Sequence, residues 1–346
     1  MLNGKAVLIT GGTGSFGKKM TQVALENYNP EKLIVFSRDE LKQFEMSQRW
    51  SQKKYPCIRY FLGDVRDKER LMRAFHGVDY IIHAAALKQV PAAEYNPAEF
   101  IKTNIMGAMN VVDAAIYNNV KRVIALSTDK ACNPINLYGA TKLCSDKLFS
   151  AANVYSGHDK STRFSIVRYG NVVGSRGSVV PFFKERAKTG ILPITDQRMT
   201  RFWITLDQAV HFVIKVLGLA KGGEIFVPKI PSMKITDLAK AIAPDCSQKI
   251  VGIRPGEKIH ETLISEDEGR NAIEYNECFI IRRNHAGDSG ISNNSNGGKP
   301  CSEGFQYSSD SNPQQISIEE LRDILEMIAD DYSIEKTRWS LEDVLQ

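Results

Sequence analysis

Short apolar segments alternate with helix-like segments along the first half of the chain, and this order constrains the fold most strongly. The apolar segments span residues 6–9, 33–36, 60–62, 80–84 and 123–126. They do not alternate apolar with polar residues, which is typical of strands buried on both faces of a sheet. Segments of helical periodicity separate them, at residues 17–27, 39–53, 67–75, 97–119 and 136–155. The alternation predicts an α/β fold with a doubly wound parallel sheet, which residues 164–168 continue.

A glycine-rich loop joins the first predicted strand to the first predicted helix. Its glycines follow a G-x-x-G-x-x-G spacing from residue 11 to residue 17, rather than G-x-G-x-x-G. Glycines at such a turn let the backbone approach a pyrophosphate, whose charge meets the helix N-terminus. A plain glycine-rich turn is the alternative, but the strand before and the helix after favour a Rossmann-type dinucleotide site. The expected cofactor contacts are Gly11, Thr13, Gly14, Ser15, Phe16 and Gly17.

Beyond residue 174 the alternation breaks into shorter, proline-interrupted pieces. We expect residues 1–174 to form the dinucleotide-binding domain and residues 175–283 a smaller substrate-binding lobe, with the chain crossing between them more than once. Residues 284–313 are rich in Ser, Gly and Asn, which predicts a mobile linker or a long loop. In residues 314–346, Ser317 and Glu320 have capping-box spacing before an apolar stripe, which favours a docking helix over a recognition helix.

The composition excludes several classes of protein. A net charge of +5 without a run of Lys or Arg argues against nucleic-acid binding. The six cysteines show neither C-x-x-C pairs nor a metal-ligand spacing, so we expect reduced thiols and no metal. Charged Lys5 and the glycine-rich loop interrupt any signal-like apolar stretch, and the apolar segment 209–220 is too short to span a bilayer. These features predict a soluble, cytoplasmic protein.

Two short segments carry acid–base groups. Tyr138 and Lys142 lie four residues apart, which places them on one helix face. A neighbouring ammonium favours phenolate, so we expect the pKa of Tyr138 to fall from about 10 toward the working pH. Tyr138 is then a candidate general base for a hydroxyl proton while hydride leaves the carbon. Asp129 and Lys130 form a second pair, which simple hydride transfer would not need; a surface charge pair is the alternative.

The end of the second predicted strand bears on the choice of cofactor. An NAD-binding protein commonly has Asp or Glu there, but this chain has Ser37 and Arg38. A guanidinium matches the geometry of a 2′-phosphate, and Lys42 can reinforce its charge. Asp39 or Glu40 is the alternative ribose acceptor if the strand ends later, and Arg38 can also be an ordinary solvated residue. The sequence favours NADP.

Together these segments resemble the extended short-chain dehydrogenase/reductase family. Within it, the resemblance narrows to inverting nucleotide-sugar 4,6-dehydratases that act on UDP-N-acetylglucosamine. The segments that carry it are residues 11–17, 37–42, 63–67, 83–88, 102–104, 127–130, 133–142, 168–174 and 252–258. The resemblance implies that hydride passes from sugar C4 to NADP, water is eliminated across C5 and C6, and hydride returns to C6. The implied product is a UDP-2-acetamido-2,6-dideoxy-L-arabino-hexos-4-ulose, inverted at C5.

The resemblance also assigns roles to the acid–base groups. Tyr138 and Lys142 serve proton transfer at the 4-hydroxyl, and Thr128 hydrogen-bonds the 4-oxygen. Asp129 is the candidate acid for the 6-hydroxyl, and Lys130 is the candidate base for C5, where retaining dehydratases have glutamate. Lys130 can act as a base only if its pKa falls well below about 10.4, and we expect desolvation and the nearby Lys142 to lower it.

Further binding residues follow from the resemblance. The remaining cofactor contacts are Asp64 and Val65 beside the adenine, Ala84, Ala85 and Ala86 after the fourth strand, and Thr103. The expected substrate contacts are Lys88, Asn171, Arg254 and Glu257. Arg201 is a further candidate, because its positive charge suits an anionic substrate. We expect His83 to be a buried histidine with its hydrogen bonds satisfied, rather than a catalytic residue. The helices over 97–119 and 136–155 correspond to a four-helix dimer interface in relatives, which predicts a homo-oligomer. A 4-epimerase and a non-catalytic NADP-binding scaffold are the rival functions.

Overall fold

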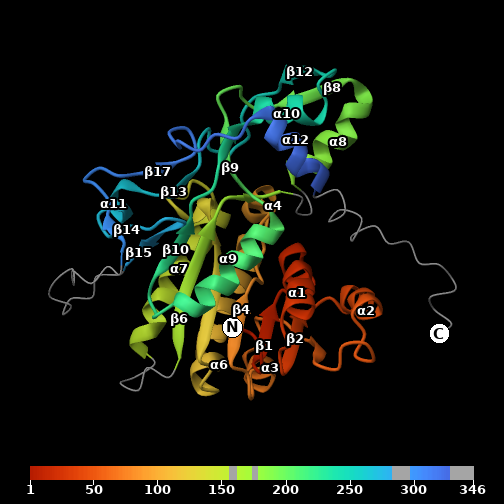
Figure 1. The fold of residues 1–346 in the computed structure, drawn as a ribbon, viewed down its shortest axis with the longest axis vertical. Helices are drawn as coiled ribbons and strands as arrows, with labels where there is room; N and C mark the ends of the chain where they lie inside the picture. Colours follow the sequence, from red (N-terminus) through yellow and green to blue (C-terminus); the bar gives the residue numbers. More distant parts are fainter. Residues whose placement is uncertain (156–161, 174–177, 283–296, 328–346) are drawn as a thin grey trace.

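The computed structural model describes residues 1–155, 162–173, 178–282 and 297–327 (Figure 1). Within them, the largest sheet has ten strands in the order β16-β14-β15-β10-β6-β5-β4-β1-β2-β3. Its parallel part comprises β1 (Ala6–Thr10), β2 (Lys32–Ser37), β3 (Ile58–Leu62), β4 (Tyr80–His83), β5 (Arg122–Thr128), β6 (Arg163–Tyr169) and β10 (Ile225–Pro228). The predicted doubly wound parallel sheet is confirmed.

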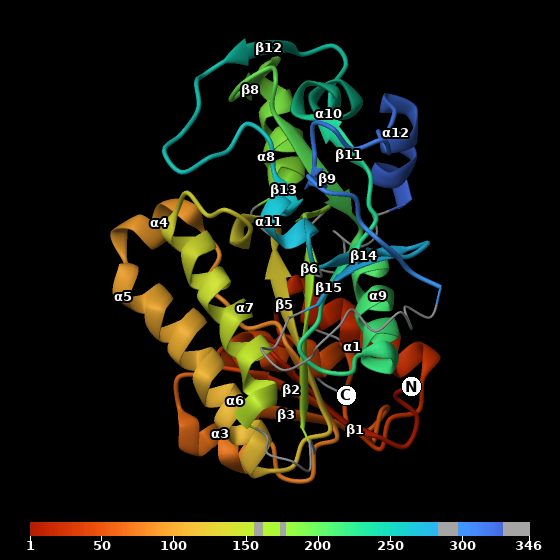
Figure 2. The same ribbon diagram turned by 90° about the vertical axis from the view of Figure 1, so that its left-hand side faces the viewer.

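Helices cover both faces of this sheet, and Figure 2 shows the two layers on opposite sides. One face packs on α1 (Ser15–Asn27) and α9 (Leu206–Leu219). Helix α2 (Glu40–Arg49) packs against β2 and β3. The other face packs on α3 (Lys68–Ala74), α6 (Gly107–Tyr117) and α7 (Leu137–Tyr155). Every residue of β1 is buried, as its continuous apolar run requires. Because these strands are parallel, their carboxyl ends lie together at one edge of the sheet.

The single helix predicted over residues 97–119 is confirmed as one helical segment over residues 97–117, but it is not α-helical throughout. After α4 (Val90–Tyr95), the chain forms α5 (Pro97–Phe100), a π-helical segment η1 (Ile101–Met106) and only then α6. Asn104 in the π-helical segment turns inward: its Oδ1 accepts from the N–H of Leu87, and its Nδ2 donates to the Leu87 carbonyl and to Thr141 Oγ1. These bonds tie the loop after β4 to α7. Such widened turns occur often at functional sites.

The smaller lobe lies over the carboxyl ends of the strands, at the top of Figure 1. It contains α8 (Val179–Arg186), the short 3₁₀ turn η3 (Ala187–Thr189), β8 (Ile191–Ile194), β9 (Thr200–Ile204), β11 (Ser232–Lys234), α10 (Ile235–Ile242) and β12 (Ser247–Ile250). Strand β9 pairs with β11 and with β7 (Asn171–Val172), while β8 pairs with β12. A separate apolar cluster that includes Phe183, Trp203 and Leu238 forms the core of the lobe.

The two lobes are not consecutive stretches of sequence. After β9 the chain returns to the large sheet through α9 and β10. It returns again in β14 (Ala272–Glu274) and β15 (Cys278–Ile281), which pair antiparallel at the sheet edge. Residue 174 therefore marks a first crossing rather than the end of the sheet domain. Strand β10 is a short apolar segment, and it is buried in the large sheet by parallel pairing with β6.

Residues 297–313 are packed, so the mobile-linker prediction is wrong for them and the long-loop alternative holds. Strand β16 (Lys299–Pro300) pairs with β14, and β17 (Tyr307–Ser308) pairs with β13 (Thr262–Ile264). Tyr307 is buried, and its hydroxyl accepts from the N–H of Ile230 and donates to the Ile230 carbonyl. These anchors depend on contacts distant in sequence, which composition does not reveal. The rest of the predicted linker, up to residue 296, lies outside the described residues.

The predicted docking helix is confirmed as α12 (Ile318–Met327). The Ser317 hydroxyl accepts from the Glu320 N–H, and the Glu320 carboxylate accepts from the Ser317 N–H, which completes the capping box. Leu321 and Leu325 are buried in the core of the smaller lobe. The remainder of the predicted C-terminal segment, residues 328–346, lies outside the described residues. No helix in the described part of the chain is long and apolar enough to cross a membrane.

Candidate active site

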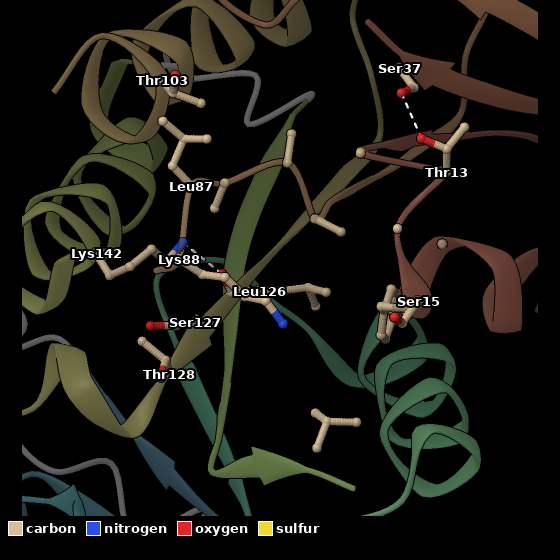
Figure 3. Close-up of a pocket in the computed structure, with 18 of the residues that line it drawn as sticks. Thr13, Ser15, Ser37, Leu87, Lys88, Thr103, Leu126, Ser127, Thr128 and Lys142 are labelled. Atoms are coloured by element: carbon tan, nitrogen blue, oxygen red, sulfur yellow. Dashed lines mark hydrogen bonds between the residues drawn. The ribbon is translucent and has the colours of Figure 1, made fainter. Parts of the chain in front are cut away.

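A cavity of ≈ 690 Å³ opens at the carboxyl ends of the parallel strands, below the smaller lobe. It brings together all the expected catalytic residues, all the expected cofactor contacts and two expected substrate contacts. These are Gly11, Thr13, Gly14, Ser15, Phe16, Gly17, Ser37, Arg38, Lys42, Asp64, Val65, Ala84, Ala85, Ala86, Lys88, Thr103, Thr128, Asp129, Lys130, Tyr138, Lys142 and Asn171. Figure 3 shows Thr13 and Ser15 across the cavity from Lys88, Thr128 and Lys142.

The glycine-rich loop fits a pyrophosphate. Gly11 has a positive φ of 65°, and a Cβ there would lie 2.8 Å from the backbone of Ala85, so no side chain can replace it. A Cβ on Gly17 would lie 2.3 Å from the Gly12 carbonyl oxygen, so the helix packs directly against the loop. Gly14 at the N-cap of α1 has no side chain to cap the helix. The N-terminus of a helix favours a bound phosphate, so a dinucleotide phosphate would fit there.

Polar and charged side chains line the end of the cavity beside β2. Ser37 shares a hydrogen bond of 2.7 Å with Thr13 (Figure 3). The Arg38 guanidinium is 54% exposed and lies 3.5 Å from Asp64 Oδ2. Asp39 caps α2 by accepting from the Lys42 N–H, and its carboxylate also pairs with the Lys42 ammonium. Both candidates are thus engaged, Asp39 with Lys42 and Arg38 with Asp64.

Asp129 and Lys130 lie at the end of β5, in the 3₁₀ turn η2 (Asp129–Ala131). Thr128 Oγ1 donates to Asp129 Oδ1 over 2.9 Å, and Lys130 Nζ donates to the same oxygen over 3.0 Å. Asp129 is fully buried, and its Oδ2 has no hydrogen-bond partner among the described residues. A buried carboxylate oxygen without a partner, in a residue that lines a cavity, can accept a hydrogen bond from a ligand hydroxyl. The alternative of a solvated surface pair is therefore excluded.

The expected fall in the pKa of Lys130 is wrong for this structure. Burial acts to lower the pKa of Lys130, but the carboxylates of Asp129 and Glu261 raise it further than burial lowers it. Glu261 Oε1 lies 3.3 Å from Lys130 Nζ. The cation that opposes the carboxylates is Arg201, not Lys142 as expected. Sequence reasoning missed Glu261, because it lies far along the chain in a segment without a recognisable motif.

Tyr138 and Lys142 are both buried on the face of α7 that meets the cavity. Burial raises the pKa of Tyr138 to about 12, opposite to the expected direction, although Lys130 and a hydrogen bond with Thr128 act to lower it. Lys142 Nζ donates to the Leu126 carbonyl over 2.8 Å, and burial lowers the pKa of Lys142. The helical spacing predicted the shared face correctly, but it carried no information about desolvation. A cation bound beside the phenol would lower its pKa.

The expected substrate contacts divide into two groups. Lys88 and Asn171 line the cavity, and Asn171 Oδ1 is buried with no partner among the described residues. Arg201, Arg254 and Glu257 do not line it. Arg254 pairs with Glu257 over 2.7 Å and is 70% exposed.

Arg201 is buried and is not among the residues that line the cavity. Its guanidinium donates to the carbonyls of Thr200, Ile259 and Lys258 over 2.7 to 2.9 Å. The cavity lining gives no support to the substrate contact predicted for Arg201, which stays a prediction. Buried His83 bonds to Thr10 Oγ1 through Nδ1, as expected of a satisfied histidine, and burial lowers the pKa of His83 to about 3.

Comparison with known proteins shows that this chain is similar to enzymes of nucleotide sugars. Residues 7–283 match the family described as polysaccharide biosynthesis protein. The chain is 60% identical to a UDP-N-acetylglucosamine 4,6-dehydratase (inverting) from Campylobacter jejuni, over 94% of this chain and 98% of that one. It is 41% identical to a UDP-glucose 4-epimerase from Rickettsia canadensis, over 80% and 82% respectively. The X-ray structure of Pen from Bacillus thuringiensis superposes with a TM-score of 0.84 at 38% identity, over 94% and 99%.

Proposed function

The chain belongs to the polysaccharide biosynthesis protein family, and from this membership we propose that it is an inverting UDP-N-acetylglucosamine 4,6-dehydratase, a hydro-lyase. The observation that carries the proposal is the placement of two acid–base pairs in one cavity. Tyr138 and Lys142 suit oxidation at C4, and Asp129 and Lys130 suit loss of water across C5 and C6. An enzyme that only transfers hydride has no use for the second pair.

The chemistry divides among these side chains as follows. Tyr138 accepts the 4-hydroxyl proton as C4 becomes a ketone. The Thr128 hydroxyl, which donates to Asp129 Oδ1 in this structure, rotates to donate a hydrogen bond to the 4-oxygen. The ketone acidifies the hydrogen on C5, which Lys130 removes. Asp129 protonates the departing 6-hydroxyl. NADP supplies the hydride acceptor and donor and, when oxidised, a positive charge.

Two proposed groups of contacts hold the ligands. The cofactor phosphates meet the loop of Gly11 and Gly14 and the N-terminus of α1, and Lys88 and Asn171 bind the sugar or its diphosphate. Arg254 and Glu257 are proposed contacts for the diphosphate and the uridine ribose. Because they lie outside the cavity lining, this role requires the ligand to extend to their surface loop.

A UDP-sugar 4-epimerase is the alternative function, and the 41% identity to the Rickettsia canadensis epimerase favours it as the second candidate. An epimerase uses Tyr138 and Lys142 and returns hydride to C4. It needs no acid for the 6-hydroxyl and no base for C5, so Asp129 and Lys130 discriminate between the two functions. A non-catalytic scaffold would not need either pair.

The purified protein, incubated with UDP-N-acetylglucosamine and NADP in heavy water, tests the function. We expect NMR spectra to show loss of the 6-hydroxyl, a methyl group at C6, deuterium at C5 and the inverted C5 configuration. Conversion to UDP-N-acetylgalactosamine without loss of water would establish the epimerase instead. Retention at C5 would contradict inversion.

Arg38→Ala tests the cofactor preference. We expect the variant to lose NADP affinity by at least about tenfold and to change little toward NAD, because only the 2′-phosphate has a charge for the guanidinium. Isothermal titration with both cofactors measures the difference. Lys18→Ala is the matched control, because it removes a positive charge from α1 at a position outside the cavity lining. Equal losses of affinity for NADP and NAD would contradict a contact between Arg38 and the 2′-phosphate.

We further propose that the protein is a homodimer or an assembly of dimers. Helices α6 and α7 pack side by side (Figure 2), and Met109 and Tyr117 on α6 are 48% and 74% exposed. Val154 and Tyr155 at the end of α7 are 58% and 67% exposed. An apolar surface of this kind is stabilised by burial against a partner.

Light scattering at micromolar concentration checks the assembly. We expect at least a dimer for the parent protein and a shift toward monomer for Met109→Glu, because the substitution places a charge in the interface. Lys240→Glu, on α10 of the other lobe, should leave the mass unchanged. A monomeric parent protein would contradict the proposal.

A further inference from the structure

We infer that Glu261 and Arg201 are positioning residues, which hold the Asp129–Lys130 pair so that one proton transfer prepares both the acid and the base for elimination. The inference rests on the proposed function for its chemistry. Neither Glu261 nor Arg201 lines the cavity, so both act through Lys130 rather than by touching the sugar.

The four side chains form a continuous buried chain of charge. Lys130 Nζ lies 3.0 Å from Asp129 Oδ1 and 3.3 Å from Glu261 Oε1, and Arg201 Nε lies 3.9 Å from that same glutamate oxygen. Asp129, Glu261 and Arg201 are 0%, 2% and 8% exposed. Asp129 and Lys130 line the cavity, and the Lys130 side chain is 25% exposed. The free oxygen of each carboxylate, Asp129 Oδ2 and Glu261 Oε2, has no hydrogen-bond partner among the described residues.

Main-chain contacts hold the two outer members in place. The N–H of Glu261 donates to Ser309 Oγ, and the Glu261 carbonyl accepts from the Ser309 N–H. Three main-chain carbonyls hold the Arg201 guanidinium. The packed segment 297–313 therefore contributes to the site, because it fixes Glu261 behind Lys130.

The charges of the group explain why both outer residues are present. With all four side chains ionised, two cations balance two anions. A net buried charge is costly, and Glu261 alone would favour the ammonium form of Lys130 too strongly for it to act as a base. Arg201 offsets Glu261. If a proton moves from Lys130 to Asp129, Glu261 and Arg201 remain as a neutral pair, so the group carries no net charge in either form.

The elimination then balances within the site. A proton moves from Lys130 Nζ to Asp129 Oδ1 along their hydrogen bond and leaves a neutral amine and a carboxylic acid. Once C4 is a ketone, the amine lone pair takes the C5 proton, and the C5–H electron pair forms the C5=C6 bond as the C6–O bond breaks. Asp129 gives its proton to the departing hydroxyl, which leaves as water. Lys130 is again an ammonium and Asp129 a carboxylate, so no external acid or base is consumed.

The titration of Lys130 tests the inference without any turnover. The charged or titratable groups that face Lys130 are Asp129 on its own turn, Glu261, Arg201 and Tyr138. Acetic anhydride acetylates only neutral amines, so the pH dependence of Lys130 labelling, followed by peptide mass spectrometry, gives its midpoint. We expect Glu261→Gln to lower the midpoint by roughly 1 to 3 pH units and Arg201→Gln to raise it. Glu261→Asp keeps the charge and should stay closer to the parent.

Opposite shifts separate a positioning role from a structural one. Glu268→Gln is the matched control: Glu268 pairs with buried Arg168 over 2.7 Å in the same part of the chain, and it does not face Lys130. That variant should lose thermal stability without moving the Lys130 midpoint. NADP binding and thermal unfolding report folding, and if Arg201→Gln does not fold, the Gln and Asp variants of Glu261 decide. An unchanged midpoint in Glu261→Gln would overturn the inference.

The rate of C5 deuterium exchange provides the second readout. Its acid limb should move with the Lys130 midpoint, to lower pH in Glu261→Gln and to higher pH in Arg201→Gln. Exchange profiles that coincide with the parent's despite shifted labelling would also overturn the inference. A parent protein that eliminates no water would instead contradict the proposed function, and its Lys130 titration would still be measurable, so the two failures are distinguishable.

Discussion

Tyr138→Phe is expected to reduce dehydration of UDP-N-acetylglucosamine by about 10²–10⁴-fold, while NADP affinity stays near that of the parent protein. The substitution removes only the ionisable oxygen. The ring remains in its apolar surroundings of Ala93 and Phe100, so the fold and the cofactor site should persist. Turnover measured by NMR and NADP binding measured by titration together check the prediction.

A remote tyrosine provides the control for this variant. Tyr60→Phe removes a hydroxyl that donates to the Trp50 carbonyl, and Tyr60 is not among the residues that line the cavity. It should keep its turnover, because only a structural hydrogen bond is lost. Near-normal turnover in Tyr138→Phe would show that another group accepts the 4-hydroxyl proton.

Lys130→Ala should lose product formation by about 10²–10⁴-fold, because it removes the proposed base for C5. Oxidation at C4 precedes elimination and depends on Tyr138 and Lys142, so the variant can still accumulate some reduced cofactor with the 4-keto sugar. Deuterium from the solvent should enter C5 far more slowly than in the parent. NMR in heavy water and the absorbance of the reduced nicotinamide follow the two steps separately.

The control replaces a lysine outside the site. Lys121→Ala breaks an exposed ion pair with Asp79 and should leave both steps unchanged. If Lys130→Ala exchanged C5 at the parent rate, Lys130 would not be the base. Asp129 or an ordered water would then become the better candidate.

Much of the site was predictable because its parts are local in sequence. The strand before Gly11 and the helix after Gly17 define the phosphate loop within one short segment. Tyr138 and Lys142 share a face because any helix places residues four apart together. Asp129 and Lys130 reach the same cavity because parallel strands end at one edge of the sheet. Each of these relations follows from a strand–helix order that the residues themselves specify.

The position of Arg201 could not be predicted in the same way. Its charge suggested a contact with an anionic substrate, but three carbonyls hold the guanidinium behind Lys130. The Ser-, Gly- and Asn-rich composition of residues 297–313 likewise suggested mobility. One buried tyrosine, Tyr307, and its bonds to Ile230 hold that segment in place. Hydrophobic pattern and composition do not report hydrogen bonds made to distant main-chain groups.

The sequence by itself determined the doubly wound sheet, the glycine-rich loop between its first strand and helix, and the two proposed acid–base pairs, because these depend on periodicity and short spacings. Only the tertiary structure decided the protonation of those pairs. Burial raises the pKa of Tyr138 to about 12, and Glu261 helps to keep Lys130 protonated. A pKa depends on desolvation and on every charge within a few ångströms. Those neighbours come from segments far apart in the chain, which meet only when the two lobes are assembled.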